Sequence, residues 1–111
     1  KDRAKHVKKE IEHLRVERTK SGTLLEPALR GTVDLINGDE TDREQTKSMY
    51  RDVRQQHAYI ARRCHALTAE IYNTFMNFKD IYQLIHFVER LKAMSHDTEK
   101  CIDLLRSMIA K

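Results

Sequence analysis

The stretch YRDVRQQHAYIARRCHALTAEIYNTFMNFKDIYQLIHFV, residues 50–88, decides the fold, because apolar residues recur in it at alternating spacings of three and four. Such spacings define a heptad, whose a and d positions line one face of an α-helix. All but His57 and Thr74 of these positions are apolar, and we call the whole set the seam. Its members are Tyr50, Val53, His57, Ile60, Cys64, Leu67, Ile71, Thr74, Phe78, Ile81, Ile85 and Val88.

A register that continues unbroken for more than five heptads is typical of a coiled coil. We therefore expect one long helix over 42–94, with the seam as its interaction surface. The capping pair Thr41 and Glu44 marks its start. Ile60, Leu67 and Ile71 lie in the middle of the register.

Upstream of the long helix, the sequence predicts a helical hairpin over 1–38 with arms at 2–20 and 24–37. Ser21-Gly22 is typical of a helix end, and Thr23 with Glu26 has the spacing of a capping box. In the second arm, one face is expected to carry the apolar residues, which are Leu25, Leu29, Val33 and Ile36.

Downstream of the seam, the register slips once after Val88. Ser95 has the chemistry of a helix N-cap, so a separate last helix is expected over 97–110. The fold class is therefore all-α: an elongated antiparallel helical bundle or coiled coil built on one long central helix, forming a single interaction domain over 1–111.

One alternative breaks the long helix near Asn73–Asn77. The chain then has three segments of similar length, 1–38, 41–75 and 78–111, as in a three-helix bundle of spectrin-repeat size. This alternative places apolar residues in the turn and ends the register there, and the chain has no tryptophan of the kind such repeats usually bury. The continuous helix is the preferred prediction.

Composition points away from catalysis. The chain contains three glycines and no glycine-rich phosphate loop, G-x-S-x-G or H-E-x-x-H sequence. We expect no enzymatic activity, no cofactor and no catalytic residue. Only two cysteines are present, and no run of about 20 apolar residues is found. An intracellular, cytoplasmic setting is the prediction, and membrane binding is not expected.

Charge is concentrated near the start of the chain. Residues 1–20 hold eight basic and four acidic residues, which accounts for the whole net charge of +4. We expect a basic partner surface there, continued along the long helix. Its candidate members are Lys5, Lys8, Lys9, Arg15, Arg43, Lys47, Arg51 and Arg54. Acidic residues alternate with these along the chain, so nucleic acid is not the expected partner.

Two sets of residues that contain histidine have the chemistry of metal ligands. His6, Glu10 and His13 share a helical face at the spacing of metal ligands, but a solvated flank is the preferred interpretation. His57 and Cys64 lie one heptad apart in the seam, where a polar residue is able to fix register. We expect no bound metal at either place.

These patterns predict a non-enzymatic protein–protein interaction and oligomerisation module. It would belong to a larger intracellular scaffold or a cytoskeletal, trafficking or signalling protein, and would form a homodimer and bind another protein. The alternative is a basic helical module that binds nucleic acid or an acidic filament surface.

Overall fold

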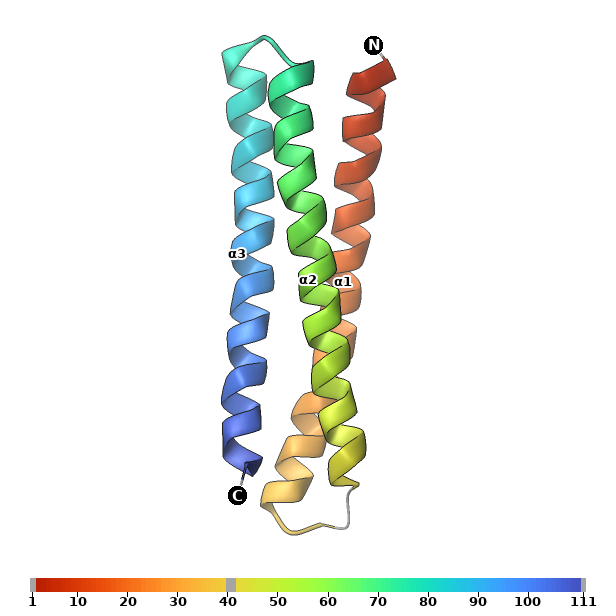
Figure 1. Cartoon of the computed structure of the whole chain (residues 1–111), viewed down its shortest axis with the longest axis vertical. Coiled ribbons are helices and arrows are strands. Elements are labelled where there is room, and N and C mark those ends of the chain that lie inside the picture. The colour runs from red at the N-terminus through yellow and green to blue at the C-terminus, as the bar shows by residue number, and fades with distance from the viewer. Residues whose placement is uncertain (1, 40–41, 111) are drawn as a thin grey trace.

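The computed structural model describes residues 2–39 and 42–110, and within them the chain forms three α-helices. These are α1 (Asp2–Ile36), α2 (Arg43–Thr74) and α3 (Phe78–Ile109). The chain runs down, up and down in Figure 1, so α2 is antiparallel to both other helices and α1 is parallel to α3. The bundle measures 57 × 19 × 15 Å. The predictions of an all-α fold and an elongated bundle are confirmed, and the three-helix alternative describes the connectivity.

The predicted continuous helix over 42–94 is wrong, because the chain reverses between Thr74 and Phe78. Phe75 ends α2 by donating its backbone N–H to the carbonyl of Ile71. Asn77 then caps α3, since its side chain accepts hydrogen bonds from two first-turn backbone N–H groups at 2.9 and 3.3 Å. The cap satisfies donors that a helix start leaves without partners.

The predicted break at Ser21-Gly22 is also absent, because α1 is one helix of 35 residues. The Thr23 hydroxyl donates to the carbonyl of Thr19, four residues back, and does not form an N-terminal cap. Gly22 and Pro27 inside a helix cost roughly 1 and 3 kcal/mol. Because the second half of α1 packs on α2 and α3, tertiary burial outweighs these local penalties.

Two further boundaries differ from the sequence prediction. The N-cap of α2 is Asp42, whose carboxylate accepts from the backbone N–H groups of the following turn; the predicted partner Thr41 lies outside the described residues. Ser95 does not begin a new helix, because α3 runs through it. Its hydroxyl lies 2.6 Å from His57 Nδ1 across the bundle, and this contact uses the oxygen that a cap would need.

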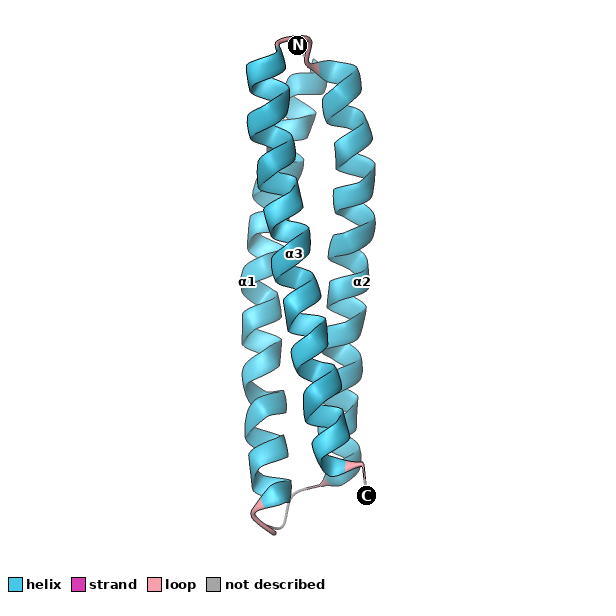
Figure 2. Ribbon diagram, turned by 90° about the vertical axis from the view of Figure 1, so that its left-hand side faces the viewer, coloured by secondary structure: helices cyan, strands magenta, loops and turns pink. Residues whose placement is uncertain are grey.

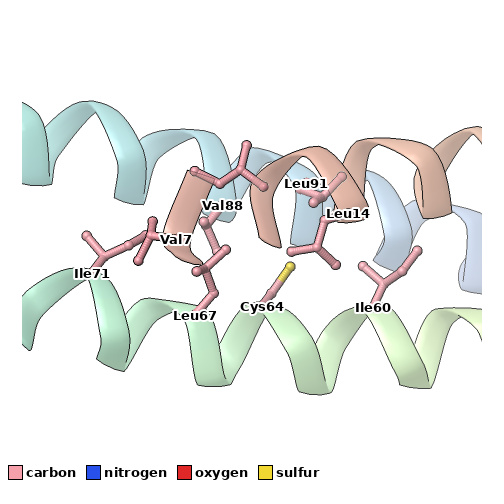
Figure 3. Close-up of a cluster of buried hydrophobic side chains, with 9 residues drawn as sticks. Val7, Leu14, Ile60, Cys64, Leu67, Ile71, Val88 and Leu91 are labelled. Atoms are coloured by element: carbon pink, nitrogen blue, oxygen red, sulfur yellow. The ribbon is translucent and has the colours of Figure 1, made fainter. Parts of the chain in front are cut away.

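The core consists of two apolar clusters, one in each half of the bundle. In the upper cluster, the α2 side chains Ile60, Cys64, Leu67 and Ile71 point towards α1 and α3 (Figure 3). The lower cluster is centred on Tyr50, whose hydroxyl contacts that of Thr32 in the interior. The members of the upper cluster from α1 and α3 are Val7, Ile11, Leu14, Val88 and Leu91, and the lower cluster also contains Ala28, Val53, Ile102, Leu105 and Ile109.

A polar layer separates the two clusters. The carboxylate of Glu17, which is only 8% exposed, accepts a hydrogen bond from the Gln56 side chain at 2.5 Å. This hydrogen bond, together with Lys20, lowers the pKa of Glu17 below its ordinary value, although burial acts in the opposite direction. A buried carboxylate is tolerated here because it is hydrogen-bonded.

Figure 2, in which α3 lies nearest the viewer, shows helix throughout the described chain except at the turns and ends. No helix in the described part of the chain is both long enough and apolar enough to cross a bilayer.

Candidate functional site

The α2 half of the seam is covered by the chain itself. Its apolar members from Tyr50 to Ile71 are each at most 1% exposed, because α1 and α3 pack on either side of them. His57 is partly buried. The homodimer prediction was based on a seam too long for the remaining segments to cover. Since α1 and α3 supply that cover, any partner surface has to lie elsewhere.

The α3 half of the seam is divided between interior and surface. Val88 is buried, whereas Phe78 is 80% exposed. Phe78 is exposed because the chain reverses just before it, so the face defined by the heptad register in α2 does not continue into α3. The ring of Phe78 instead stacks on Tyr82, and that of Tyr82 on His86, at centroid distances of 6.4 and 6.1 Å.

The predicted basic surface is split between the two ends of the bundle. Lys5, Lys8 and Lys9 are exposed near the start of α1, whereas Arg43 and Lys47 lie at the start of α2, at the opposite end (Figure 1). Arg51 is exposed. Arg54 is paired with Asp103, and Arg43 donates to the carbonyl of Ile109. These groups therefore do not form one continuous positive stripe.

An exposed apolar stripe on α1 faces away from α2. Gly31 marks the side of α1 that contacts α2, because a Cβ built on it would lie 2.7 Å from Thr46 Oγ1. Leu29 and Val33 each lie two residues from Gly31, or about 200° around the helix. Leu29, Val33 and Ile36 are 38%, 51% and 52% exposed.

Of the four residues predicted to share one face, Leu25 packs against the lower cluster, whereas Leu29, Val33 and Ile36 are exposed. The interior positions are Ala28, Gly31 and Thr32. These small side chains let α1 approach α2 closely, which turns the large apolar residues towards the flank of the helix.

A matching stripe lies on α3. Glu99 and Asp103 contact α2 through His57 and Arg54, so they mark the α2 side of α3. Met108 lies nine residues after Glu99, or about two and a half turns, which places it on the opposite side. Met94, Leu104 and Met108 are 38%, 67% and 56% exposed.

In a bundle of three helices, the sides of α1 and α3 that point away from α2 both lie on the outer surface of the α1–α3 pair. The two stripes therefore border the same side of the molecule. All their members except Met94, which lies in the middle of α3, are near the end where α1 and α3 both finish (Figure 1). Nearer the middle of the bundle, a hollow between α1 and α3 is lined by Arg15, Arg18, Phe87 and Arg90, next to Met94. We call this surface, apolar in one half and basic in the other, the α1–α3 face.

The basic half of the α1–α3 face has charge available for a ligand. Arg15 lies with its guanidinium 5.1 Å from the centre of the Phe87 ring and 3.8 Å from Glu12 on the solvent side. Within the described residues, neither Arg18 nor Arg90 is in an ion pair. Only Arg15 of this group was singled out from the sequence, because the pairing of α1 with α3 is set by the chain reversal.

The histidines of α1 contact α2 one at a time. His6 lies 3.4 Å from Glu70, and His13 lies 2.7 Å from the Tyr59 hydroxyl. Glu10 pairs with Arg63, and this carboxylate raises the pKa of Arg63. These three α1 side chains thus have separate partners on α2.

Across the bundle, His57 meets two side chains that sequence reasoning missed. His96 and Glu99 of α3 bring their ligand atoms within 4.8 Å of those of His57 and of each other. The i, i+3 spacing of His96 and Glu99 was a visible signal, but nothing in the sequence placed it opposite His57. Cys64, in contrast, is a buried free thiol whose pKa is raised to about 11 by burial, which makes it a poor nucleophile and metal ligand.

Comparison with known proteins adds no relative: this chain significantly matches no protein-family model, no curated protein and no solved structure.

Proposed function

We propose that this chain is a non-enzymatic protein–protein interaction module of a larger intracellular protein, and that it binds a partner helix on the α1–α3 face. The observation that carries the proposal is the exposure of two apolar stripes on one side of a bundle whose core is already filled. Leu104 and Met108 on α3, and Val33 and Ile36 on α1, are each more than half exposed. Apolar surface gathered on one side of a soluble bundle is typical of interaction sites.

The chemistry of the partner follows from the two halves of the face. An amphipathic helix is able to lay its apolar side along a groove between two helices, which here would complete a four-helix arrangement. Beyond the apolar half, the same helix would reach Arg15, Arg18 and Arg90. We therefore propose an acidic amphipathic helix, with its carboxylates concentrated at the end that contacts these arginines.

Self-association through the same face is less well supported than binding of an acidic helix. A second copy would bring a second set of arginines, and like charges would oppose any pairing that superimposes the two basic halves. A nucleic-acid ligand is also less well supported, because the basic residues are split between the two ends and a phosphate backbone needs a continuous track.

Two matched positions on α1 test where the partner binds. Val33 and Val16 are 51% and 54% exposed, but Val16 lies two residues, about 200°, from the buried Leu14 and faces solvent. A photo-crosslinking amino acid is placed at either position in the full-length parent protein in cells, and the crosslinked peptides are sequenced. We expect position 33 to capture an acidic amphipathic segment that position 16 does not capture.

The crosslink also has to depend on charge. Arg15→Glu with Arg18→Glu should reduce the yield at position 33, because both side chains line the basic half of the face. Equal capture at positions 16 and 33, or a yield that the reversal leaves unchanged, would contradict the proposal. A crosslink from position 33 to a second copy of the chain would also contradict the proposal, and would favour a homodimer formed through this face.

The cytoplasmic setting is part of the same proposal. Cys64 and Cys101 are both free thiols, as is usual for proteins of reducing compartments.

A further inference from the structure

We propose that His57, His96 and Glu99 form a zinc site that links α2 to α3. His57 comes from the middle of α2, and the other two side chains lie one turn apart on α3. The site lies on the side of α3 that faces α2, away from the α1–α3 face. It therefore stands independently of the proposed interaction.

The distances between ligand atoms are close to those of a tetrahedral zinc site. His57 Nε2 and His96 Nδ1 lie 3.4 and 3.7 Å from the same carboxylate oxygen, Glu99 Oε1. Ligands at about 2.0–2.1 Å from a tetrahedral ion are about 3.3 Å apart. All three atoms lie within 4.8 Å of one another, so small side-chain rotations bring them to a common centre.

The surroundings of His57 suit a metal ligand. Its Nδ1 is hydrogen-bonded to the Ser95 hydroxyl at 2.6 Å, which leaves Nε2 for a metal. Histidine ligands usually have such a partner on the second ring nitrogen, because it fixes the tautomer and the orientation of the ring. The side chains of His57 and Glu99 are only 15% and 29% exposed, so their positions are constrained by packing.

Arg54, on the same side of α2 as His57, has its own carboxylate partner on α3. Arg54 of α2 is paired with Asp103, one turn further along α3 from Glu99. Within the described residues, the side chains paired with Glu99 Oε1 are the two imidazoles, and an imidazole binds a metal in its neutral form.

Two imidazoles and one carboxylate make a known zinc ligand set, and they leave a fourth position for water or another ligand. Zinc is preferred over magnesium or calcium because those ions select oxygen ligands. The two cysteines do not contribute: Cys64 lies two turns from His57 in the core, and Cys101 lies two residues, about 200°, from Glu99. The bound ion would cross-link the middle of α2 to the middle of α3.

Zinc titration of the purified chain tests this site. Calorimetry should give one zinc ion per chain, and added zinc should raise the thermal midpoint by several degrees, because a ligand that binds only the folded state stabilises it. Co²⁺ in place of Zn²⁺ should give the visible spectrum of a tetrahedral nitrogen–oxygen site. No zinc binding, or a thiolate-to-cobalt charge-transfer band, would overturn the assignment.

Variants separate this site from adventitious binding. His96→Ala and Glu99→Gln alter exposed or partly exposed side chains, so folding should persist. Removing a partner of a ligand typically weakens binding about 10–100-fold, and we expect at least that loss from removing a ligand. Ser95→Ala should weaken binding about tenfold. His65→Ala, at an exposed histidine of α2, is the matched control and should change nothing.

The outcomes are distinct. If His96→Ala and Glu99→Gln bind zinc as tightly as the parent, or if His65→Ala weakens binding as much as they do, the ion binds elsewhere and the proposal fails.

Discussion

Replacing Gly31 by alanine should destabilise the bundle relative to the same change at Gly22. Both glycines lie inside α1, and both replacements gain about 1 kcal/mol of helix propensity. Their surroundings differ: a Cβ at Gly22 meets nothing within 4 Å, whereas a Cβ at Gly31 lies 2.7 Å from Thr46 Oγ1 and 3.3 Å from Thr46 Cγ2. Thr46 is 1% exposed and β-branched, so its side chain has little freedom to move away.

The difference between the two variants isolates this close contact, because the propensity gain cancels. Overpacking a filled interior costs about 1–3 kcal/mol. We expect Gly22→Ala to be about 1 kcal/mol more stable than the parent, and Gly31→Ala to be about 1–3 kcal/mol less stable than Gly22→Ala. Urea unfolding followed by circular dichroism should show midpoints that differ by about 1 M at a typical slope for a small domain.

The same glycine replacement in a Thr46→Ala background identifies the atoms responsible. Thr46→Ala removes both contacting atoms, so Gly31→Ala in that background should stabilise as Gly22→Ala does. If Gly31→Ala and Gly22→Ala agree within about 0.5 kcal/mol in the parent background, α1 and α2 do not approach each other at Gly31 as the structure has them.

Three further changes probe the cap, the polar layer and the core. Asn77→Ala should lower the free energy of unfolding by about 1 kcal/mol because it removes the cap of α3. Asn73→Ala, at an exposed position, should change this free energy little. Equal urea midpoints for the two variants would contradict the cap. The pKa of Glu17 is lowered in the folded state, so its contribution to stability is complete above the unfolded pKa and is lost as the pH falls through the folded value. As the pH is lowered, Gln56→Ala should lose less stability than the parent protein, because the variant lacks the hydrogen bond to the Glu17 carboxylate. The same dependence on pH in both proteins would count against this hydrogen bond. Leu67→Asp should abolish the cooperative unfolding transition, since it places an unpaired charge in the upper cluster; a native-like transition would mean that Leu67 is not in the core.

The sequence predicts the helical content and most of the α2 core, because the period of apolar residues reports which side of a helix is buried. It does not decide whether the chain reverses, although the three-helix alternative places the break near Asn73–Asn77, where the structure has it. The heptad register continues numerically through Phe75–Asn77, although the residues before and after belong to different helices. The only local signal is Asn77 as a cap, worth about 1 kcal/mol, and the long apolar register conceals it.

The opposite error occurs in α1, where glycine and proline predicted a break that does not form. Local propensity is a weak determinant when both halves of a helix pack on the same neighbours. The α1–α3 face and the meeting of His57 with Glu99 depend on which helices become neighbours. Neither was predictable from spacing along the chain, because the residues concerned are separated by tens of positions.

The reversal at Phe75–Asn77 is the feature on which the closed core, the α1–α3 face and the zinc site all depend. Small-angle X-ray scattering of the isolated chain tests it directly. The folded-back bundle has a Cα radius of gyration of 17.4 Å and a longest extent of 57 Å. A continuous helix over 42–94 would alone be about 80 Å long at 1.5 Å per residue. We predict a maximum dimension close to that of the bundle with a hydration layer; a dimension of about 80 Å or more would contradict the reversal.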